Sequence, residues 1–488
     1  DEVLVTKGGS GLPDGAPDYQ AKLFGYDGQG GFKAAAEGVL PALAISAGVA
    51  VAADFDRDGR LDLFIGGRVR PGQYPLPAQS ALLRNVGGRF EDVTEQLAPG
   101  LKEVGLVTSA LWSDVDGDGW LDLLLTLEWG TVRYFHNDRG KGFTDWSERS
   151  GFAAAGTGWW SSIAGADFNG DGKMDYVVGN VGLNTPYRAS AQYPALLFSG
   201  DFKGDGSSQL IEAYYEEGKL YPRRTRKDLG ASIPSVLQRF QTNNAYAKAT
   251  LEEIVGAEQL ASARRFAATE FRSGVFLSQA DGTHRFEPLP LIAQIAPCQG
   301  LAAGDFDGDG KADIYAVQNS YAPIPSVGRF DGGLSQLLLG DGRGGFLAAP
   351  PAHSGLVVPG DAKALCLCDW DHSGWPGFLI SRNNASLLAF RPQPLPGRNS
   401  LLIRLKGPAG NPHAIGARLT LTLKDRSSQT AEIHAGSGYY SQPPPLASFG
   451  FPSSNPPAAL SVLWPNGSAT EHAPPVKSGC VSLSPPAS

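Results

Sequence analysis

Four short segments of the chain carry a polar or acidic side chain at positions one, three, five and nine. These residues are Asp54, Asp56, Asp58 and Asp62; Asp114, Asp116, Asp118 and Asp122; Asp167, Asn169, Asp171 and Asp175; and Asp305, Asp307, Asp309 and Asp313. Oxygen ligands at alternate positions can converge on one hard cation, and Ca²⁺ accepts such ligands in a flexible geometry. The sixth residue is always Gly, which supplies the positive φ that lets the chain fold around an ion.

A main-chain oxygen extends the expected ligand set. The carbonyl of the seventh residue can point inward, and the seventh residues are Arg60, Trp120, Lys173 and Lys311. The sequence therefore predicts about four Ca²⁺ sites as the cofactor of this protein.

Two further copies of the pattern have lost ligands. The copy that begins at Asp201 has Lys203 at its third position, and the copy that begins at Asp369 has Ser373 at its fifth. We expect both to keep the turn and to bind metal weakly or not at all. The Lys203 ammonium can replace the cation with an internal salt bridge.

The EF-hand is excluded as the origin of these segments. That motif needs a Glu at its twelfth position and a helix on each side. The twelfth positions here are Ile65, Leu125, Val178 and Ala316. The flanking runs are short, apolar and bounded by Gly, which is typical of buried strands. Each acidic segment is therefore predicted to be a hairpin loop.

A second marker recurs at the same interval and indicates the fold. Gly-rich turns that end in Phe occupy 26–32, 85–90, 137–143, 281–286 and 340–346. Strand, acidic loop, strand, connection, strand, Gly turn and strand make one four-stranded unit, and repeats of about 60 residues suit a propeller. We predict an all-β fold with a propeller of about seven blades. Six blades is the alternative, because too few residues separate Asp167 from Asp201 for a full blade.

Two departures from the repeat define the domain organisation. Helix-forming residues with helical spacing predict an insertion at about 222–270 within a propeller that spans 1–396. A Pro-rich stretch at 391–399 precedes further strand-like runs, so residues 397–488 are predicted to form a separate small β domain.

Composition narrows the function classes. The 488 residues carry a formal charge of −8, so there is no electrostatic case for nucleic acid as a partner. No apolar run is long enough for a transmembrane segment. No secretory signal is visible, and we expect a chain that is either intracellular or already processed. The seven histidines form no cluster in the sequence, and no nucleophile elbow occurs.

The motifs resemble those of a known family. The acidic repeats are similar to the FG-GAP/VCBS repeats of integrin-α-like β-propellers. The C-terminal region resembles the ASPIC/UnbV domain at 411–417, 436–442, 449–450 and 462–467. The combination is similar to the family of cartilage acidic protein and its bacterial relatives. This resemblance implies calcium in the loops, an extracellular, cell-surface or periplasmic location, and binding or assembly instead of catalysis.

The leading hypothesis is a calcium-stabilised interaction module whose partner is a protein or glycan outside the cytoplasm. The alternative is a carbohydrate-binding propeller that uses some of Trp112, Trp120, Trp129, Trp146, Trp159 and Trp160, although packing between blades is the simpler interpretation. A polysaccharide-active enzyme is less favoured. Asp1 aligns with the ninth position of an acidic loop, so the first blade lacks its inner strand. Either that strand comes from elsewhere in the chain or, as we expect, the chain is a piece of a longer protein or part of a larger assembly.

Overall fold

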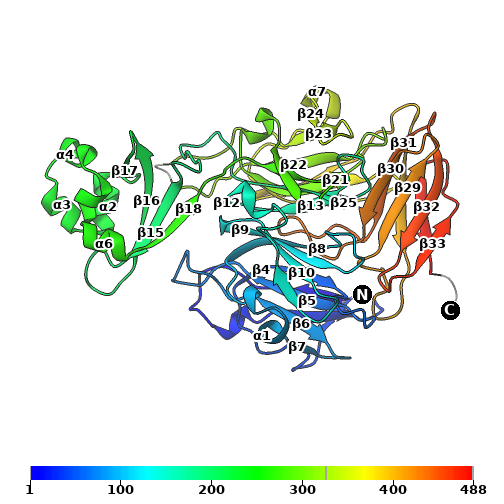
Figure 1. The fold of residues 1–488 in the computed structure, drawn as a ribbon, viewed down its shortest axis with the longest axis horizontal. Helices are drawn as coiled ribbons and strands as arrows, with labels where there is room; N and C mark the ends of the chain where they lie inside the picture. Colours follow the sequence, from blue (N-terminus) through cyan, green and yellow to red (C-terminus); the bar gives the residue numbers. More distant parts are fainter. Residues whose placement is uncertain (1, 325–326, 486–488) are drawn as a thin grey trace.

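The computed structural model describes residues 2–324 and 327–485, and the prediction for Asp1 lies outside them. Six antiparallel sheets of the repeated kind follow one another along the chain (Figure 1). The first three contain β1 (Glu2–Val5), β2 (Lys22–Tyr26) and β3 (Phe32–Ala34); β4 (Ala47–Ala53), β5 (Asp62–Gly67), β6 (Ala81–Asn85) and β7 (Phe90–Asp92); and β8 (Leu106–Ser113), β9 (Asp122–Gly130), β10 (Arg133–Asn137) and β11 (Phe143–Asp145), with β12 (Gly158–Trp159) added to β9.

The other three sheets continue the series. They contain β13 (Ile163–Ala166), β14 (Asp175–Val178), β19 (Gly274–Ser278) and β20 (His284–Pro288); β21 (Cys298–Gly304), β22 (Asp313–Gln318), β23 (Gln336–Gly340) and β24 (Phe346–Ala348); and β25 (Ala362–Cys368), β26 (Gly377–Arg382) and β27 (Ala385–Phe390). The arrangement is propeller-like, and a closed ring is not seen in the described residues.

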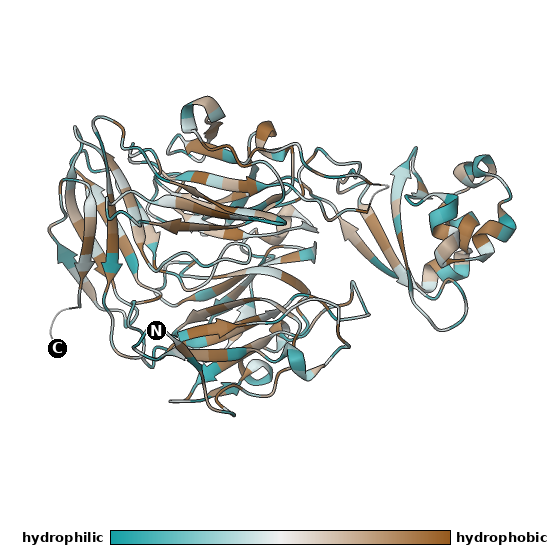
Figure 2. Cartoon of the chain, turned by 180° about the vertical axis from the view of Figure 1, so that it is seen from behind, coloured by the Kyte–Doolittle hydropathy of each residue, from teal (hydrophilic) through white to brown (hydrophobic). Residues whose placement is uncertain are grey.

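Apolar residues between neighbouring sheets hold this series together. The inner strands β4, β8, β13, β21 and β25 contact one another in that order. The second strands are buried along most of their length, as in β5 and β9, because each is covered on both faces by an adjacent sheet. Figure 2 shows the resulting apolar strands inside the molecule. Between the second and third sheets, Phe55, Phe64 and Trp112 share one buried cluster.

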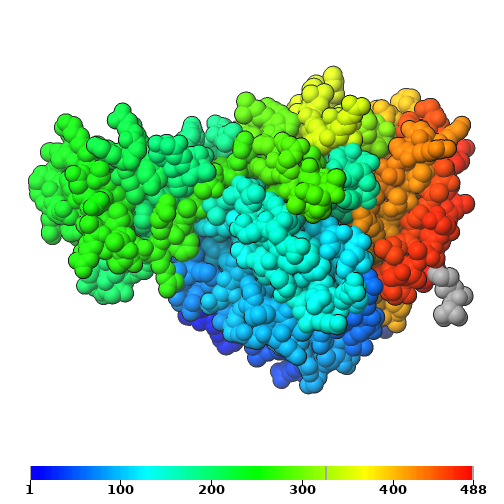
Figure 3. Space-filling model, in the orientation of Figure 1, coloured from blue at the N-terminus to red at the C-terminus, as the bar shows by residue number. Residues whose placement is uncertain are grey.

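An inserted unit separates the two halves of the fourth sheet. β14 pairs directly with β19, and Val178 lies opposite Gly274. The residues between them form a separate sheet of β15 (Ala195–Gly200), β16 (Gln209–Glu216), β17 (Lys219–Pro222) and β18 (Arg264–Ala268). Five helices follow β17: α2 (Arg226–Ser232), α3 (Ser235–Arg239), α4 (Asn243–Lys248), α5 (Leu251–Val255) and α6 (Ala257–Ser262). The inserted unit therefore contains a sheet as well as the expected helices, and it projects from the body as an arm (Figure 3).

The C-terminal region is a pair of packed sheets. One sheet contains β28 (Arg398–Leu405), β31 (Ala447–Pro452) and β34 (Gly479–Leu483). The other contains β29 (Arg418–Leu423), β30 (Ser428–Glu432), β32 (Pro457–Leu463) and β33 (Ala469–His472). Ile403 and Leu405 of β28 are buried, and they share one core with Phe449 and Trp464. This domain and the inserted unit lie at opposite ends of the longest axis (Figure 1).

Two short α-helices, α1 (Thr94–Leu97) and α7 (Pro351–Ser354), lie among the six repeated sheets. None of the helices in the described ranges has the length and apolar character needed to cross a membrane.

Candidate metal centres

The four acidic segments are hairpin loops between the first and second strands of four successive sheets. Each ninth aspartate pairs with the last residue of the preceding inner strand, as Asp62 does with Ala53 and Asp122 with Ser113. The same register holds for Asp175 and Asp313. The hairpin prediction is confirmed. The loops lie together at the end of the inner strands that faces the C-terminal domain, and this end is called the loop face.

The first aspartate of each loop organises the turn. Asp54 accepts hydrogen bonds from the main-chain N–H groups of Asp58 and Gly59 at 3.0 and 2.9 Å. Asp305 likewise accepts from Gly310 at 2.7 Å. Gly59 and Gly310 have φ values of 87° and 93°, so the Gly at the sixth position is required by the left-handed backbone there.

The ninth aspartate ties the loop to the third strand of its sheet. In Asp122, Oδ2 accepts from the N–H of Val115 at 3.1 Å and Oδ1 accepts from the N–H of Asn137 at 2.7 Å. The other three ninth aspartates repeat both contacts, and their second donors are Asn85, Ser278 and Gly340. All four ninth aspartates are at most 1% exposed. Their carboxylates therefore serve the protein backbone whether or not they also face a metal.

Ligand oxygens meet in three of the four loops. Candidate ligand atoms lie within 4.8 Å of one another in three loop clusters. These are Asp54, Asp56 and Asp58; Asp114, Asp116 and Asp118; and Asp305, Asp307 and Asp313. Among the described residues, the third loop, which has Asn169 at its third position, brings no three carboxylates together in this way. The amide oxygen of Asn169 accepts from the N–H of Asp171 at 3.0 Å, as Asp116 does from Asp118 and Asp307 does from Asp309.

The electrostatics of the loops favour a bound cation. Burial, together with other carboxylates of the same loop, raises the pKa of Asp62 to about 8 and the pKa of Asp305 to about 7. Burial also raises the pKa of Asp114 and of Asp175 to about 7. Buried carboxylates that lie close together repel each other unless a positive charge is bound between them. The side chains at positions one, three, five and nine offer carboxylate or amide oxygens, which fit a hard divalent cation.

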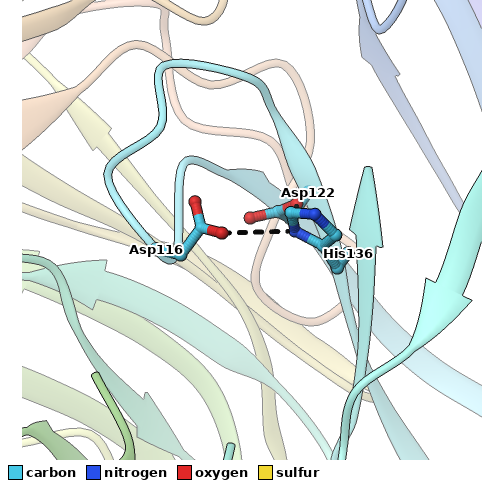
Figure 4. Close-up of side chains that lie close together, drawn as sticks. All are labelled: Asp116, Asp122 and His136. Atoms are coloured by element: carbon cyan, nitrogen blue, oxygen red, sulfur yellow. Dashed lines mark ion pairs between the residues drawn. The ribbon is translucent and has the colours of Figure 1, made fainter. Parts of the chain in front are cut away.

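The second loop contains a nitrogen donor that the sequence pattern does not show. Nδ1 of His136 lies 3.3 Å from Oδ2 of Asp116 and 3.3 Å from Oδ1 of Asp122 (Figure 4). Its ring stacks on Trp146 with centroids 3.7 Å apart. A hydrogen bond to Asp122, opposed by burial, raises the pKa of His136.

The side chains at the seventh positions point to other partners. Arg60 forms an ion pair with Asp58, and Lys311 lies 3.3 Å from Asp309. The Trp120 ring lies under the guanidinium of Arg57 at 4.1 Å, and Lys173 donates to the carbonyl of Gln279. The carbonyl oxygens of these four residues remain predicted ligands.

The two degenerate loops keep the turn, as predicted. Asp201 accepts from the N–H of Gly206 at 2.7 Å, and Asp369 accepts from that of Gly374 at 3.2 Å. Lys203 lies 3.9 Å from Asp205, which is the expected internal ion pair. The Asp201 loop connects β15 to β16 and therefore belongs to the inserted sheet. Hydrogen bonds from Gly206 and other main-chain N–H groups lower the pKa of the exposed Asp201 carboxyl, in contrast to the buried first aspartates.

The C-terminal domain covers the loop face. Nη1 of Arg418 lies 3.6 Å from Oδ2 of Asp114, and its Nη2 donates to the carbonyl of Gly172 at 2.9 Å. The buried Glu432 accepts from Oγ of Ser113 at 2.6 Å and from the N–H of Asp114 at 3.3 Å. Burial raises the pKa of Glu432. Two acidic loops are thus in direct polar contact with β29 and β30.

Glycines allow equally close contact at two further loops. A Cβ on Gly410 would lie 2.1 Å from the carbonyl oxygen of Gly59, and one on Gly450 would lie 2.1 Å from Asp305. Any side chain at either position would collide with the loop beneath. The docking surface of the C-terminal domain is therefore fitted to the shape of the acidic loops.

Sequence reasoning missed several residues of this site. The N–H groups that donate to the ninth aspartates belong in three loops to Asn85, Asn137 and Gly340. Each of these residues is the first of a Gly-rich turn, so the sequence pattern could have identified them. No local signal marks Arg418 or Glu432, because the contacts to Gly172 and Ser113 join residues 246 and 319 positions apart in the chain.

Comparison with known proteins agrees with this architecture at the level of domains. Residues 114–178 match the model of an FG-GAP-like repeat, and residues 407–479 match that of the ASPIC and UnbV domain. The first match begins at the second acidic loop and ends with β14. The chain thus carries an FG-GAP-like repeat and a C-terminal ASPIC/UnbV domain, as the resemblance of its motifs predicted. No curated protein matches.

Similarity to solved structures is weak. The V. cholerae biofilm matrix protein Bap1 is 13% identical, with a TM-score of 0.22, over 88% of this chain and 58% of its own. Trypanosoma rangeli sialidase in complex with the inhibitor DANA is 11% identical, with a TM-score of 0.25, over 90% of this chain and 58% of its own. This chain spans less than two thirds of either protein, and similarities this low support no functional argument.

Proposed function

We propose that the protein is a calcium-stabilised interaction module that works outside the cytoplasm, without catalytic activity. In this proposal calcium fixes the acidic loops and so fixes the surface on which the C-terminal domain docks. The observation that carries it is the contact between Arg418 and two loops at once, since Arg418 reaches both Asp114 and Gly172.

The chemistry of the loops supports calcium as the ion. Asp54, Asp56 and Asp58 in the first loop, with the corresponding residues of the other three, would hold the ion through oxygen atoms. When bound, the ion would supply positive charge that offsets the repulsion between buried carboxylates. Extracellular modules bind Ca²⁺ with dissociation constants of ~10⁻⁴–10⁻³ M, which suits an environment rich in calcium.

The inferred role is mechanical and not catalytic. The first and ninth aspartates accept hydrogen bonds from main-chain N–H groups, as Asp122 does from Val115 and Asn137. Each loop thereby links the first, second and third strands of its sheet. A rigid loop face would present one fixed surface to the C-terminal domain and would leave the opposite face and the inserted arm for partners.

Chelation tests this proposal directly. The full chain is melted in excess calcium, after treatment with EGTA, and after calcium is restored. We expect the chelator to lower the melting temperature by several degrees and calcium to recover it, while magnesium at the same concentration recovers less, because Mg²⁺ demands near-octahedral geometry and keeps its waters. A melting curve that is identical in all conditions would exclude calcium as a structural component.

A second readout follows the two domains. Residues 391–397 link β27 to β28 and contain exposed positions, so a protease can sample them when the C-terminal domain moves. We expect faster cleavage of this linker in EGTA than in calcium. Equal cleavage rates with an altered melting temperature would show that calcium stabilises the sheets without fastening the domains.

A further inference from the structure

A cavity of about 460 Å³ opens at the face opposite the acidic loops. Its walls come from the ends of several sheets that surround the inner strands. Arg68 follows β5, Glu128 belongs to β9, Trp159 to β12, and Asn180 follows β14. The C-terminal domain contributes one more wall residue, Tyr439.

Tyr439 reaches this cavity because the segment 434–442 runs along the inner strands. The N–H of Ala52 in β4 donates to the carbonyl of Ala435 at 2.9 Å. Ser109 of β8 donates to the carbonyl of Gly438 at 2.6 Å, and the N–H of Gly438 donates to the carbonyl of Ile163. The segment thus passes between the inner strands to the opposite mouth, where it turns back at the antiparallel bridge between Ser437 and Ser441.

The polar groups of the cavity are held in fixed positions. Arg68 forms an ion pair with Glu128, whose Oε1 also accepts from the hydroxyl of Tyr74 at 2.6 Å. Nε1 of Trp129 donates to the same hydroxyl at 2.7 Å. Trp129 has a φ of 63°, an unusual backbone for a bulky residue, and it directly follows Glu128. Strain of this kind is retained where the surroundings enforce a particular geometry.

Two indole donors in the wall have no partner among the described residues. Nε1 of Trp159 and Nε1 of Trp160 are buried and lack a hydrogen-bond acceptor there. Trp160 as a whole is 0% exposed. A buried unpaired donor is costly, and native structures rarely contain two together.

We propose that this cavity binds a neutral saccharide ring. The apolar C–H face of a pyranose packs on an aromatic face, and half-buried Trp159 and Tyr439 supply such surfaces. The ring hydroxyls donate and accept at once, which matches the carboxylate of Glu128 and the guanidinium of Arg68 in the wall. The volume accommodates one or two sugar rings.

The charges of the cavity select a neutral ligand. Arg68 and Glu128 compensate each other, so the described wall residues offer no free cation for an acidic sugar, a phosphate or a nucleotide. A purely apolar ligand would remove water from the ion pair of Arg68 and Glu128 without offering hydrogen bonds in return. A neutral polyol with one apolar face satisfies both conditions.

The test is binding of defined neutral oligosaccharides of glucose, galactose and mannose to the full chain in saturating calcium. Binding is measured by saturation-transfer NMR and by tryptophan fluorescence. We expect at least one neutral series to bind, and Trp159→Ala and Glu128→Gln each to weaken binding at least tenfold. The control is Trp370→Ala, which removes an exposed indole from the Asp369 loop on the opposite face.

Each outcome decides the assignment. Loss of binding in Trp159→Ala, with the melting temperature within a few degrees of wild type and binding intact in Trp370→Ala, supports it. Absence of binding to every neutral series, preference for uronic or sialic acids, or undiminished binding in both cavity variants overturns it. If Trp159→Ala fails to fold, Glu128→Gln alone carries the decision. Because calcium is present throughout, none of these outcomes alters the result of the chelation experiment.

Discussion

The guanidinium of Arg418 lies 3.6 Å from the carboxylate of Asp114, so a side chain of the ASPIC/UnbV domain contacts the first residue of an acidic loop. Both side chains are largely buried, at 16% and 6% exposed. The same guanidinium donates to Gly172 in the neighbouring loop. A single residue therefore joins two candidate metal loops to the C-terminal domain.

Replacing Arg418 with Met should loosen the domain contact. The Arg418→Met variant keeps an apolar stem but leaves Asp114 and the Gly172 carbonyl without their donor, at a cost of about 1–3 kcal/mol. We expect faster proteolysis of the 391–397 linker and a lower melting temperature. Arg404→Met, at an exposed position of the same domain, is the matched control. Equal cleavage of the two variants would contradict a fastening role.

The ninth aspartate should matter for stability even without metal. Asp122→Asn places an amide donor opposite the N–H of either Val115 or Asn137, because an amide has only one oxygen. We expect a loss of about 1–3 kcal/mol in urea unfolding performed in EGTA. Asp118→Asn keeps an acceptor for the N–H of Trp120 and should cost far less under the same conditions. Similar losses in both variants would show that general loop charge, and not the two backbone contacts, sets the effect.

The number of calcium ions should follow the intact loops. Titration calorimetry of the wild type is expected to give about four sites. Asp307→Ala removes a candidate ligand from the loop between β21 and β22 and should reduce the number by one. Asp205→Ala, in the loop where Lys203 already forms an ion pair, should leave it unchanged. A lower site number for Asp205→Ala would mean that the degenerate loop binds metal after all.

Acid should weaken the anchor of the inner segment through His434. Burial lowers the pKa of His434 to about 4, while Nδ1 donates to the carbonyl of Trp112 at 3.0 Å. The folded pKa lies below the unfolded value of about 6.5, so the unfolded chain takes up the proton first and stability falls as the pH drops from about 6.5 to about 4. The full effect is at most roughly 3 kcal/mol.

The His434→Asn variant removes the pH dependence that His434 contributes to stability, because its amide retains a donor for Trp112 and does not titrate. We expect urea unfolding of the variant to depend less on pH between about 6.5 and 4 than that of the wild type. Glu432, 3.9 Å from His434, has a raised pKa and is present in both proteins. His353→Asn, at an exposed position on α7, should keep the wild-type slope. Parallel slopes for wild type and His434→Asn would refute the assignment.

The acidic loops could be predicted from the sequence because the residues that form the turn are close together in the chain. The first aspartate, the Gly at position six and the ninth aspartate lie within nine residues, and the hydrogen bonds that close the turn itself form within the same hairpin. The Gly-rich turns were equally visible, although their role as donors to Asp62 and Asp122 was not.

The inserted sheet and the covered loop face could not be predicted because they depend on distant pairs. The Asp201 loop resembles the other acidic loops, since Asp201 and Gly206 make the same turn and Gln209 accepts the N–H of Phe202 as an aspartate would. Only the pairing of β14 with β19 shows that it lies outside the series. Position in space, and not the local motif, separates these loops.

The segment 434–442 also has a consequence for the order of folding. The N–H of Ala52 and the hydroxyl of Ser109 find their acceptors at Ala435 and Gly438, which are synthesised long after them. Contacts this remote in sequence form late, because the chain entropy of closing the loop must be overcome first. We expect the six sheets to form around a solvated centre, which the last part of the chain then fills as it folds.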